Sequence, residues 1–391
     1  MLNRRILRIK AMQALYSYYL AENSLKAVIQ ENLEKEFTID PAKDDFLQAP
    51  EFEKRKRSAI NLYLKRLGKE SPDTKDLEKE IVDAVNKAQE DYYSALRDES
   101  VSINKRMFSD INDIHNMYFK LLLLPIAFTT IEKAEKEKKE KAHIQRFSTW
   151  NFNFIDNPVI KALNAYPDFQ KEVRNRKVDW SKEEDTLRGW FKDVLQKNER
   201  LIEYQGSKSP TDEEHLDAVV YLMKKIVFKD EIISDYLGSI DLRWNENKPV
   251  LSSLVVKTLQ GFNKDDAENP FELKTISKNE KDDLIFFKKL YEESVKNNDH
   301  LEEVISEKTR NWDISRVALL DKIILKMALV EMTNFPSIPV KVTINEFIEI
   351  SKLYSTPKSK QFVNGILDVL ANELTSDGVI KKSGRGLIDN K

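Results

Sequence analysis

The scarcity of turn-forming residues is the feature that most restricts how this chain can fold. It has 9 glycines and 12 prolines among 391 residues, less than half the average share of these two residues, which is roughly 12%. Folds built from many short antiparallel strands need a tight turn after almost every strand, and glycine and proline supply those turns. The sequence therefore predicts an all-α fold, and its 41% apolar content is enough for a packed core.

Composition also excludes several classes of chemistry. The chain has no cysteine, which excludes disulfide scaffolds, zinc ribbons, iron–sulfur ligation and a cysteine nucleophile. Its four histidines lack metal-ligand spacing, and no nucleophile–base pair or phosphate-binding loop is apparent. We therefore expect no enzyme, no catalytic residue, no metal, no cofactor and no small-molecule substrate.

The longest uninterrupted apolar run, residues 121–128, is too short to cross a membrane. The first residues, Met-Leu-Asn-Arg-Arg-Ile-Leu-Arg, contain no apolar segment typical of a secretory signal. We expect a cytoplasmic protein with no membrane partner.

The N-terminal segment has a one-sided charge. Residues 1–21 contain no acidic residue, and Arg4, Arg5 and Arg8 fall within one arc of a predicted amphipathic helix. Cations at the start of a helix oppose its macrodipole, so the cluster favours a polyanionic partner. The alternative is an ordinary solvated basic start.

The start of the last predicted helix has residues suited to RNA. Lys360 could contact a phosphate, Asn364 a base edge, and Phe362 could stack on a base. The alternative is a surface Lys and Asn beside a core Phe. Gly365 inside this helix costs about 1 kcal/mol relative to Ala, which predicts a close approach of another element to its backbone. Thr343 is expected to cap the N-terminus of the helix that comes just before this last one.

Two sets of residues resemble the NusB family of transcription antitermination factors. Residues 341–346 read Lys-Val-Thr-Ile-Asn-Glu, and residues 362–368 read Phe-Val-Asn-Gly-Ile-Leu-Asp. Near the N-terminus the arginine cluster runs into residues 11–17, Ala-Met-Gln-Ala-Leu-Tyr-Ser. These motifs occur in the family's order, about 330 residues apart.

The resemblance implies a NusB-like helical bundle that is discontinuous in sequence. Residues 1–37 and 281–376 would form the RNA-binding domain, 38–280 a helical insertion domain, and 377–391 a flexible tail. Within the insertion, residues 215–262 resemble 284–332 and could be a degenerate repeat of them. The alternative is that both are ordinary amphipathic hairpins.

The resemblance also implies the function and its residues. Family members bind the boxA element of ribosomal RNA leader transcripts with a NusE-type small-subunit ribosomal protein, as part of the RNA polymerase antitermination complex. The residues carried over to this chain as RNA-binding are Arg4, Arg5, Arg8, Gln13, Tyr16, Lys360, Phe362 and Asn364. Ile6 interrupts the run of three arginines often found in the family, which puts one phosphate contact in doubt.

Two other functions were weighed. The NusB fold also forms the front module of ribosomal RNA cytosine methyltransferases, but no glycine-rich cofactor loop follows it here and the chain has no cysteine. A helical protein–protein adaptor of the transcription machinery that lacks specific RNA binding is the remaining alternative. The slight acidic excess of residues 38–280 favours it, and the retained arginines oppose it.

Overall fold

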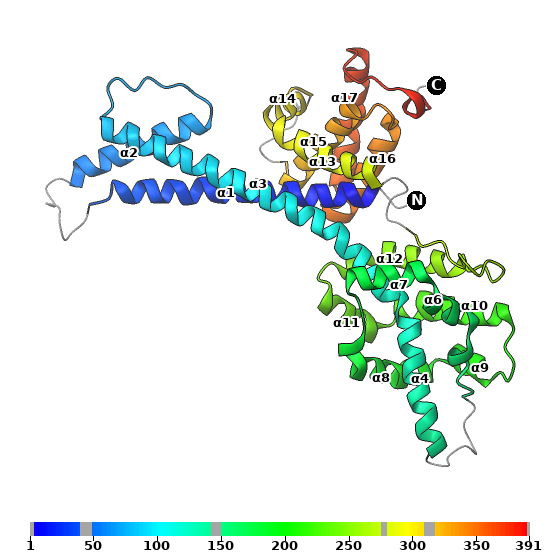
Figure 1. Ribbon diagram of the computed structural model, residues 1–391. Coiled ribbons are helices and arrows are strands. Elements are labelled where there is room, and N and C mark those ends of the chain that lie inside the picture. Colours follow the sequence, from blue (N-terminus) through cyan, green and yellow to red (C-terminus); the bar gives the residue numbers. More distant parts are fainter. Residues whose placement is uncertain (1–3, 40–48, 142–149, 275–279, 309–316, 389–391) are drawn as a thin grey trace. The chain divides into compact units, whose positions relative to one another are not determined.

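The computed structural model describes residues 4–39, 49–141, 150–274, 280–308 and 317–388 (Figure 1). These residues form helices joined by loops, with no β-strand among them, so the all-α prediction is confirmed. They divide into two compact units, which are described separately below. One contains residues 4–108 and 281–391, and the other contains residues 109–280.

The discontinuous unit combines both ends of the chain. Its helices are α1 (Arg4–Glu36), α2 (Ala49–Leu67), the first part of α3 (Lys79–Leu122), α13 (Glu280–Lys296), α14 (Asn298–Lys308), α15 (Leu319–Asn334), α16 (Val340–Tyr354) and α17 (Ser359–Ser376).

Helix α15 is the centre of this unit. Every residue from Ile323 to Met332 is buried, as expected for a helix that is apolar on all sides. It packs against α1, α14, α16 and α17. The segment Phe335–Pro339 then reverses the chain, and α16 begins directly after Pro339 because proline cannot continue the preceding helix.

The segment after α17, residues 377–388, packs against the loop 335–339 between α15 and α16. Ser383 N donates to the carbonyl of Pro336 at 3.0 Å, and Lys382 Nζ donates to the carbonyl of Phe335 at 3.1 Å. A Cβ on Gly386 would collide with the Pro336 carbonyl oxygen, so only glycine fits there. Residues 377–388 of the expected flexible tail are thus packed, because backbone donors find acceptors on the loop.

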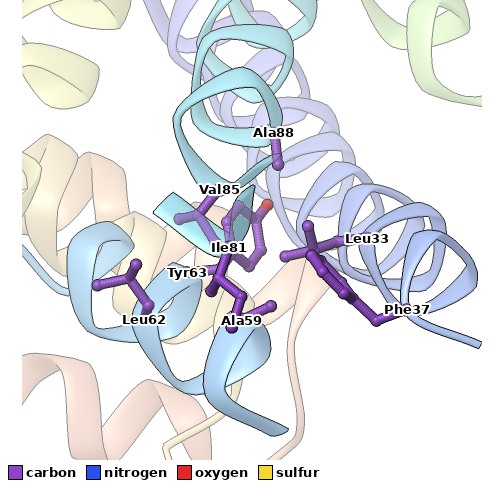
Figure 2. Packing of buried hydrophobic residues seen from close by; sticks show 8 residues of the cluster. All are labelled: Leu33, Phe37, Ala59, Leu62, Tyr63, Ile81, Val85 and Ala88. Carbon is purple, nitrogen blue, oxygen red and sulfur yellow. The ribbon is translucent and has the colours of Figure 1, made fainter. Parts of the chain in front are cut away.

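A second core joins the distal half of α1 to α2 and α3. Figure 2 shows its eight side chains pointing toward one another from the three helices: Leu33, Phe37, Ala59, Leu62, Tyr63, Ile81, Val85 and Ala88. This shared core explains why residues 38–108 group with the NusB-like helices, although we expected them in the insertion. We call α2, the distal half of α1 and the first part of α3 the arm.

The other unit is a separate set of helices. They are the end of α3, α4 (Leu124–Lys141), α5 (Asn153–Asp156), α6 (Pro158–Ala165), α7 (Pro167–Arg176), α8 (Glu184–Asp193), α9 (Glu199–Gly206), α10 (Asp212–Tyr221), α11 (Glu231–Ile240) and α12 (Trp244–Gln260). A π-helical stretch, Leu222–Val227, follows α10.

The expected repeat corresponds to α10–α12 on one side and α13–α15 on the other. When residues 215–262 are aligned with 284–332, Lys257 corresponds to Lys326. The two lysines differ in environment, since Lys257 is exposed while Lys326 is buried. The relation between the two segments therefore stays a prediction.

One helical stretch, Lys79–Lys141, contains a window long and apolar enough to cross a membrane by length and composition. However, 61% of that window is buried inside the protein. Core helices of globular proteins pass the same criterion, so this stretch is weak evidence for a membrane span.

Candidate nucleic-acid interface

The first turns of α1 hold two half-exposed arginines against carboxylates of other helices. Arg5 donates through Nε and Nη2 to the two carboxylate oxygens of Glu346 on α16, at 2.8 and 2.7 Å. This hydrogen bonding raises the pKa of Arg5. Arg4 Nε donates to Asp283 at 2.9 Å, and its guanidinium lies 4.9 Å from the ring centre of Phe286. Both guanidinium groups are held in place but remain accessible.

Arg8 differs from our expectation of a surface residue. It is 3% exposed and donates to both carboxylate oxygens of Glu331 on α15, at 2.6 and 2.7 Å. Glu331 is fully buried and also accepts a 2.8 Å hydrogen bond from the Thr343 hydroxyl. A charge buried this deeply is tolerated only when it is paired. Arg8 is therefore inside the domain because it neutralises Glu331.

Thr343 is correspondingly not a helix cap. Helix α16 begins at Val340, so Thr343 lies within its first turn and points into the core. Its hydroxyl connects α16 to the Arg8–Glu331 pair. An N-cap hydroxyl accepts a hydrogen bond from a backbone N–H of its own helix, whereas the Thr343 hydroxyl donates to Glu331 on another helix.

Gln13 and Tyr16 continue α1 beyond the arginines. Gln13 is half-buried, and its Oε1 accepts a hydrogen bond from the buried Lys10 at 3.4 Å. Tyr16 is 40% exposed. It lies on the same face of α1 as Arg5, about 16 Å further along the helix axis. Arg5 and Tyr16 thus border one strip of α1 surface.

Helix α17 supplies the other predicted residues. Lys360 is exposed, and Phe362 is half-buried. Asn364 donates from Nδ2 to Asp368 at 3.0 Å, one turn further along the helix. Its amide oxygen is an acceptor available to a ligand.

The expectation that another element closely approaches Gly365 is wrong. Gly365 is exposed, and a Cβ placed on it would have nothing within 4 Å. The packed stripe of α17 lies on its other side, where Val363, Leu367 and Leu370 are buried. Glycine is thus not required here by contacts within the protein.

The start of α1 and the start of α17 both act on one carboxylate of α16. The pKa of Glu349 is lowered, first by a hydrogen bond from Lys352 and then by the charges of Lys352, Arg5 and Lys360. Arg5 contacts α16 through Glu346, and α17, which carries Lys360, packs against α16. The structure therefore brings two predicted residues, more than 350 positions apart, to the same region.

Sequence reasoning missed the acidic partners of the arginines. Asp283, Glu331 and Glu346 come from three different helices: Asp283 pairs with Arg4, Glu331 with Arg8, and Glu346 with both Arg5 and Arg8. Glu331 carried a usable signal, since a lone acid within the apolar run Ala-Leu-Val-Glu-Met must be buried with a partner. Asp283 and Glu346 lie in mixed charged segments and carried no such signal.

The surface formed in this way can bind anions and unstacked bases. Arg4, Arg5 and Lys360 supply cationic donors suited to phosphate, while Tyr16 supplies an exposed ring suited to stacking. Among the described residues no group of His, Asp or Glu side chains could hold a metal ion.

Comparisons with known proteins match the C-terminal part of the chain. The sequence pattern of the NusB family matches residues 250–372. The match thus begins in α12, ahead of the start that we expected at residue 281. No solved structure gave a significant match.

Three curated proteins described as transcription antitermination protein NusB are similar to this chain. The one from Chloroherpeton thalassium is 46% identical over 107 residues, which are 27% of this chain and 50% of that protein. The one from Salinibacter ruber is 42% identical over 103 residues, which are 26% of this chain and 64% of that protein. The one from Dictyoglomus turgidum is 37% identical over 105 residues, which are 27% of this chain and 71% of that protein.

The chain thus spans between half and about two thirds of the length of the first two relatives. It is also much longer than the matched region, since residues 1–249 and 373–391 lie outside the family match. The third relative is covered over 71% of its length at 37% identity. This chain therefore belongs to the NusB family.

Proposed function

We propose that this chain is an RNA-binding transcription antitermination factor. It binds the boxA element of ribosomal RNA leader transcripts together with a NusE-type small-subunit ribosomal protein, in the cytoplasm and within an RNA polymerase antitermination complex. The observation that carries the proposal is the joining of the two family motifs at α16. Arg5 pairs with Glu346 there, and Lys360 of α17 acts on Glu349 of the same helix.

The proposal divides the carried-over residues by role. Arg4, Arg5 and Lys360 contact phosphates, Tyr16 and Phe362 stack on bases, and Gln13 and Asn364 bond base edges or sugar. Arg8 is a positioning residue, because it holds Glu331 and through it Thr343 and α16. In this proposal it fixes the surface without touching RNA.

A specific observation also favours the adaptor alternative. Each of the three arginines is already paired with a carboxylate, so the local positive field is weaker than the sequence suggests. A polyanion must compete with Asp283 and Glu346. If it cannot, the same surface is a protein-docking face.

The test is a titration of the full chain with a labelled boxA-type RNA and a scrambled RNA, at two salt concentrations, with and without the NusE-type protein. Tighter binding of boxA RNA that the partner strengthens is the expected result. Equal weak binding of both RNAs, with the partner still captured, would establish the adaptor.

Variants assign the surface. In Arg5→Ala and in Lys360→Ala, the slope of log RNA affinity against log salt concentration should become shallower. The change should be about 0.7 for every phosphate that the variant no longer binds. Lys26→Ala is the control, because Lys26 lies further along α1 and pairs with Glu22. An unchanged slope in both test variants would exclude this surface as the RNA site.

A further inference from the structure

Helix α2 of the arm is unusually basic for a surface helix in a nearly neutral protein. It carries six basic residues and two acidic ones, whereas the whole chain has 64 basic and 66 acidic residues. The family match does not include this helix. Its charge therefore needs a separate explanation.

The two faces of α2 have opposite characters. Ala59, Leu62 and Tyr63 are buried in the arm core shown in Figure 2. At 100° per residue, the opposite face falls within an arc of about 80°. It presents four exposed residues, which we call the basic stripe: Lys54, Arg57, Asn61 and Lys65.

The cations of α2 divide into paired and unpaired ones. On its flanks, Arg55 pairs with Glu78 and Glu80, and Lys56 pairs with Glu53. Within the part of the chain that the structure describes, Lys54, Arg57 and Lys65 form no ion pair or hydrogen bond. The unpaired charges are therefore collected on the solvent face.

A shallow groove of about 440 Å³ follows the first part of this face. It is lined by Pro50, Glu53, Lys54, Arg57, Ser58 and Asn61. Its one carboxylate, Glu53, is occupied by Lys56 at the edge. The groove thus offers ammonium, guanidinium, hydroxyl and amide donors, the groups that commonly bind phosphate and sugar oxygens.

The spacing of the stripe suits a charged polymer. Successive members are three or four residues apart, so they follow one another every ~4.5–6 Å and extend over ~16 Å. Three unpaired cations on one face repel one another, and a partner that supplies several linked negative charges removes that repulsion. A single small anion would neutralise only part of the stripe.

We propose that the basic stripe on α2 binds the phosphate backbone of single-stranded RNA flanking the element bound at α1, α16 and α17. This inference rests on the proposed RNA-binding function and extends it. The stripe has no aromatic ring and one amide, so it contributes affinity without reading sequence.

The geometry sets the length of RNA required. Leu33, which packs in the same core as α2, lies 29 residues after Arg4 on the continuous helix α1. That separation corresponds to ~43 Å along the helix axis. A strand rising ~3.4 Å per nucleotide needs about 13 nucleotides for this distance, in addition to those held at α1, α16 and α17. An RNA limited to the boxA element therefore cannot occupy both surfaces.

The experiment compares three RNAs on the full chain: a boxA-type 12-mer, the same 12-mer with a 30-nucleotide uridine extension, and a scrambled RNA of that total length. The stripe variant is Lys54→Ser/Arg57→Ser/Lys65→Ser. The control variant is Lys171→Ser/Lys192→Ser/Lys208→Ser, which removes the same charge from exposed residues of the other unit.

We expect the native chain to bind the extended RNA more tightly than the 12-mer. The stripe variant should lose this advantage, with about tenfold weaker binding of both long RNAs and a salt slope lower by about 2. Binding of the 12-mer should stay unchanged, as should all binding by the control variant. The conservative variant Lys54→Arg/Arg57→Lys/Lys65→Arg should retain the advantage of the extension.

Several outcomes would overturn the inference. The native chain could bind the extended RNA no more tightly than the 12-mer, or the stripe variant could keep the tighter binding of the extended RNA. The control variant could also lose as much RNA affinity as the stripe variant. Loss of binding to an acidic protein partner with RNA binding intact would assign the stripe to protein instead. Failure of the proposed function is a separate result, since it appears as equal binding of extended boxA RNA and scrambled RNA of the same length.

Discussion

At the scale of single residues, the three N-terminal arginines have the same chemistry but different environments. Arg4 and Arg5 keep more than a third of their side-chain surface exposed, whereas 4% of the Arg8 side chain is exposed. An exposed ion pair contributes at most about 1 kcal/mol. Breaking a buried pair leaves an uncompensated charge, and this costs several kcal/mol. The cluster is therefore part accessible surface and part structural support.

Arg8→Met should lower the free energy of unfolding by about 3–5 kcal/mol, because it leaves Glu331 buried without its partner. Arg5→Ala should lower it by no more than about 1 kcal/mol. Urea unfolding of the two variants measures both values. The double variant Arg8→Met/Glu331→Leu should recover part of the loss, and similar costs for Arg8→Met and Arg5→Ala would contradict the buried pairing.

At the scale of helices, α1 contributes to two cores. Helix α1 packs by its first turns against α15 and by its last turns against α2 and α3. Tyr63 lies at the centre of the arm core and is fully buried. Its hydroxyl has no hydrogen-bond partner among the described residues. Burial also raises the pKa of Tyr63 to about 12.

Tyr63→Phe should raise the free energy of unfolding by about 1 kcal/mol, because it removes an unsatisfied buried hydroxyl and keeps the ring. Leu33→Ala, in the same core, should lower it by about 2–5 kcal/mol through the cavity it leaves. Hydrogen exchange of α2 amides reports both effects locally. A loss of stability in Tyr63→Phe would mean that the hydroxyl does have a partner.

At the scale of the whole molecule, the two units depend on different buried carboxylates. In residues 109–280, Glu132 is fully buried and accepts hydrogen bonds from Trp150 at 2.7 Å, Gln205 at 2.8 Å and the backbone N–H of Ile155 at 3.1 Å. Burial raises its pKa to about 7 from 4.5, although these hydrogen bonds oppose the rise. Glu132 therefore holds its proton in the folded state at pH values where the unfolded chain has lost it.

This difference makes the stability of the unit depend on pH. Between pH 4.5 and about 7 the folded state binds more protons than the unfolded state, so stability falls as pH rises through that range. Thermal unfolding at pH 5, 6 and 7.5 should show a falling midpoint. Four of the five tryptophans lie in residues 109–280, so their fluorescence follows this unit. In Glu132→Gln the unfolding midpoint should depend less on pH. If the midpoint falls as steeply with rising pH in that variant as in the native chain, another group causes the fall.

The helical class and the family were predictable from local features. Few glycines and prolines restrict turns, and apolar residues at helical spacing, as in α15, specify which helices are buried. The motifs around Arg5, Lys360 and Asn364 carried the family resemblance, and the family match over residues 250–372 includes Lys360 and Asn364 but not Arg5. These features are readable because they depend on residues within a few turns of one another.

The placement of side chains was predictable only where local pattern and burial agree. In α17 helical spacing and burial agree, since Val363 and Leu367 lie one turn apart and both are buried. The same kind of reasoning placed Arg8 on the surface and a neighbouring element against Gly365, and the structure differs at both positions. Helical periodicity identifies a face, but it does not identify what covers that face.

The sequence by itself determined the helical class and the family, and the RNA-binding residues read from it stay a prediction. The tertiary structure alone decided which arginine is buried, where the two units divide and how the C-terminal segment packs. Arg8 and Glu331 are 323 residues apart, and Gly386 packs on Pro336 although two helices separate them in the chain. Such contacts depend on complementary charge and shape between elements that meet only after folding, and no local pattern encodes that meeting.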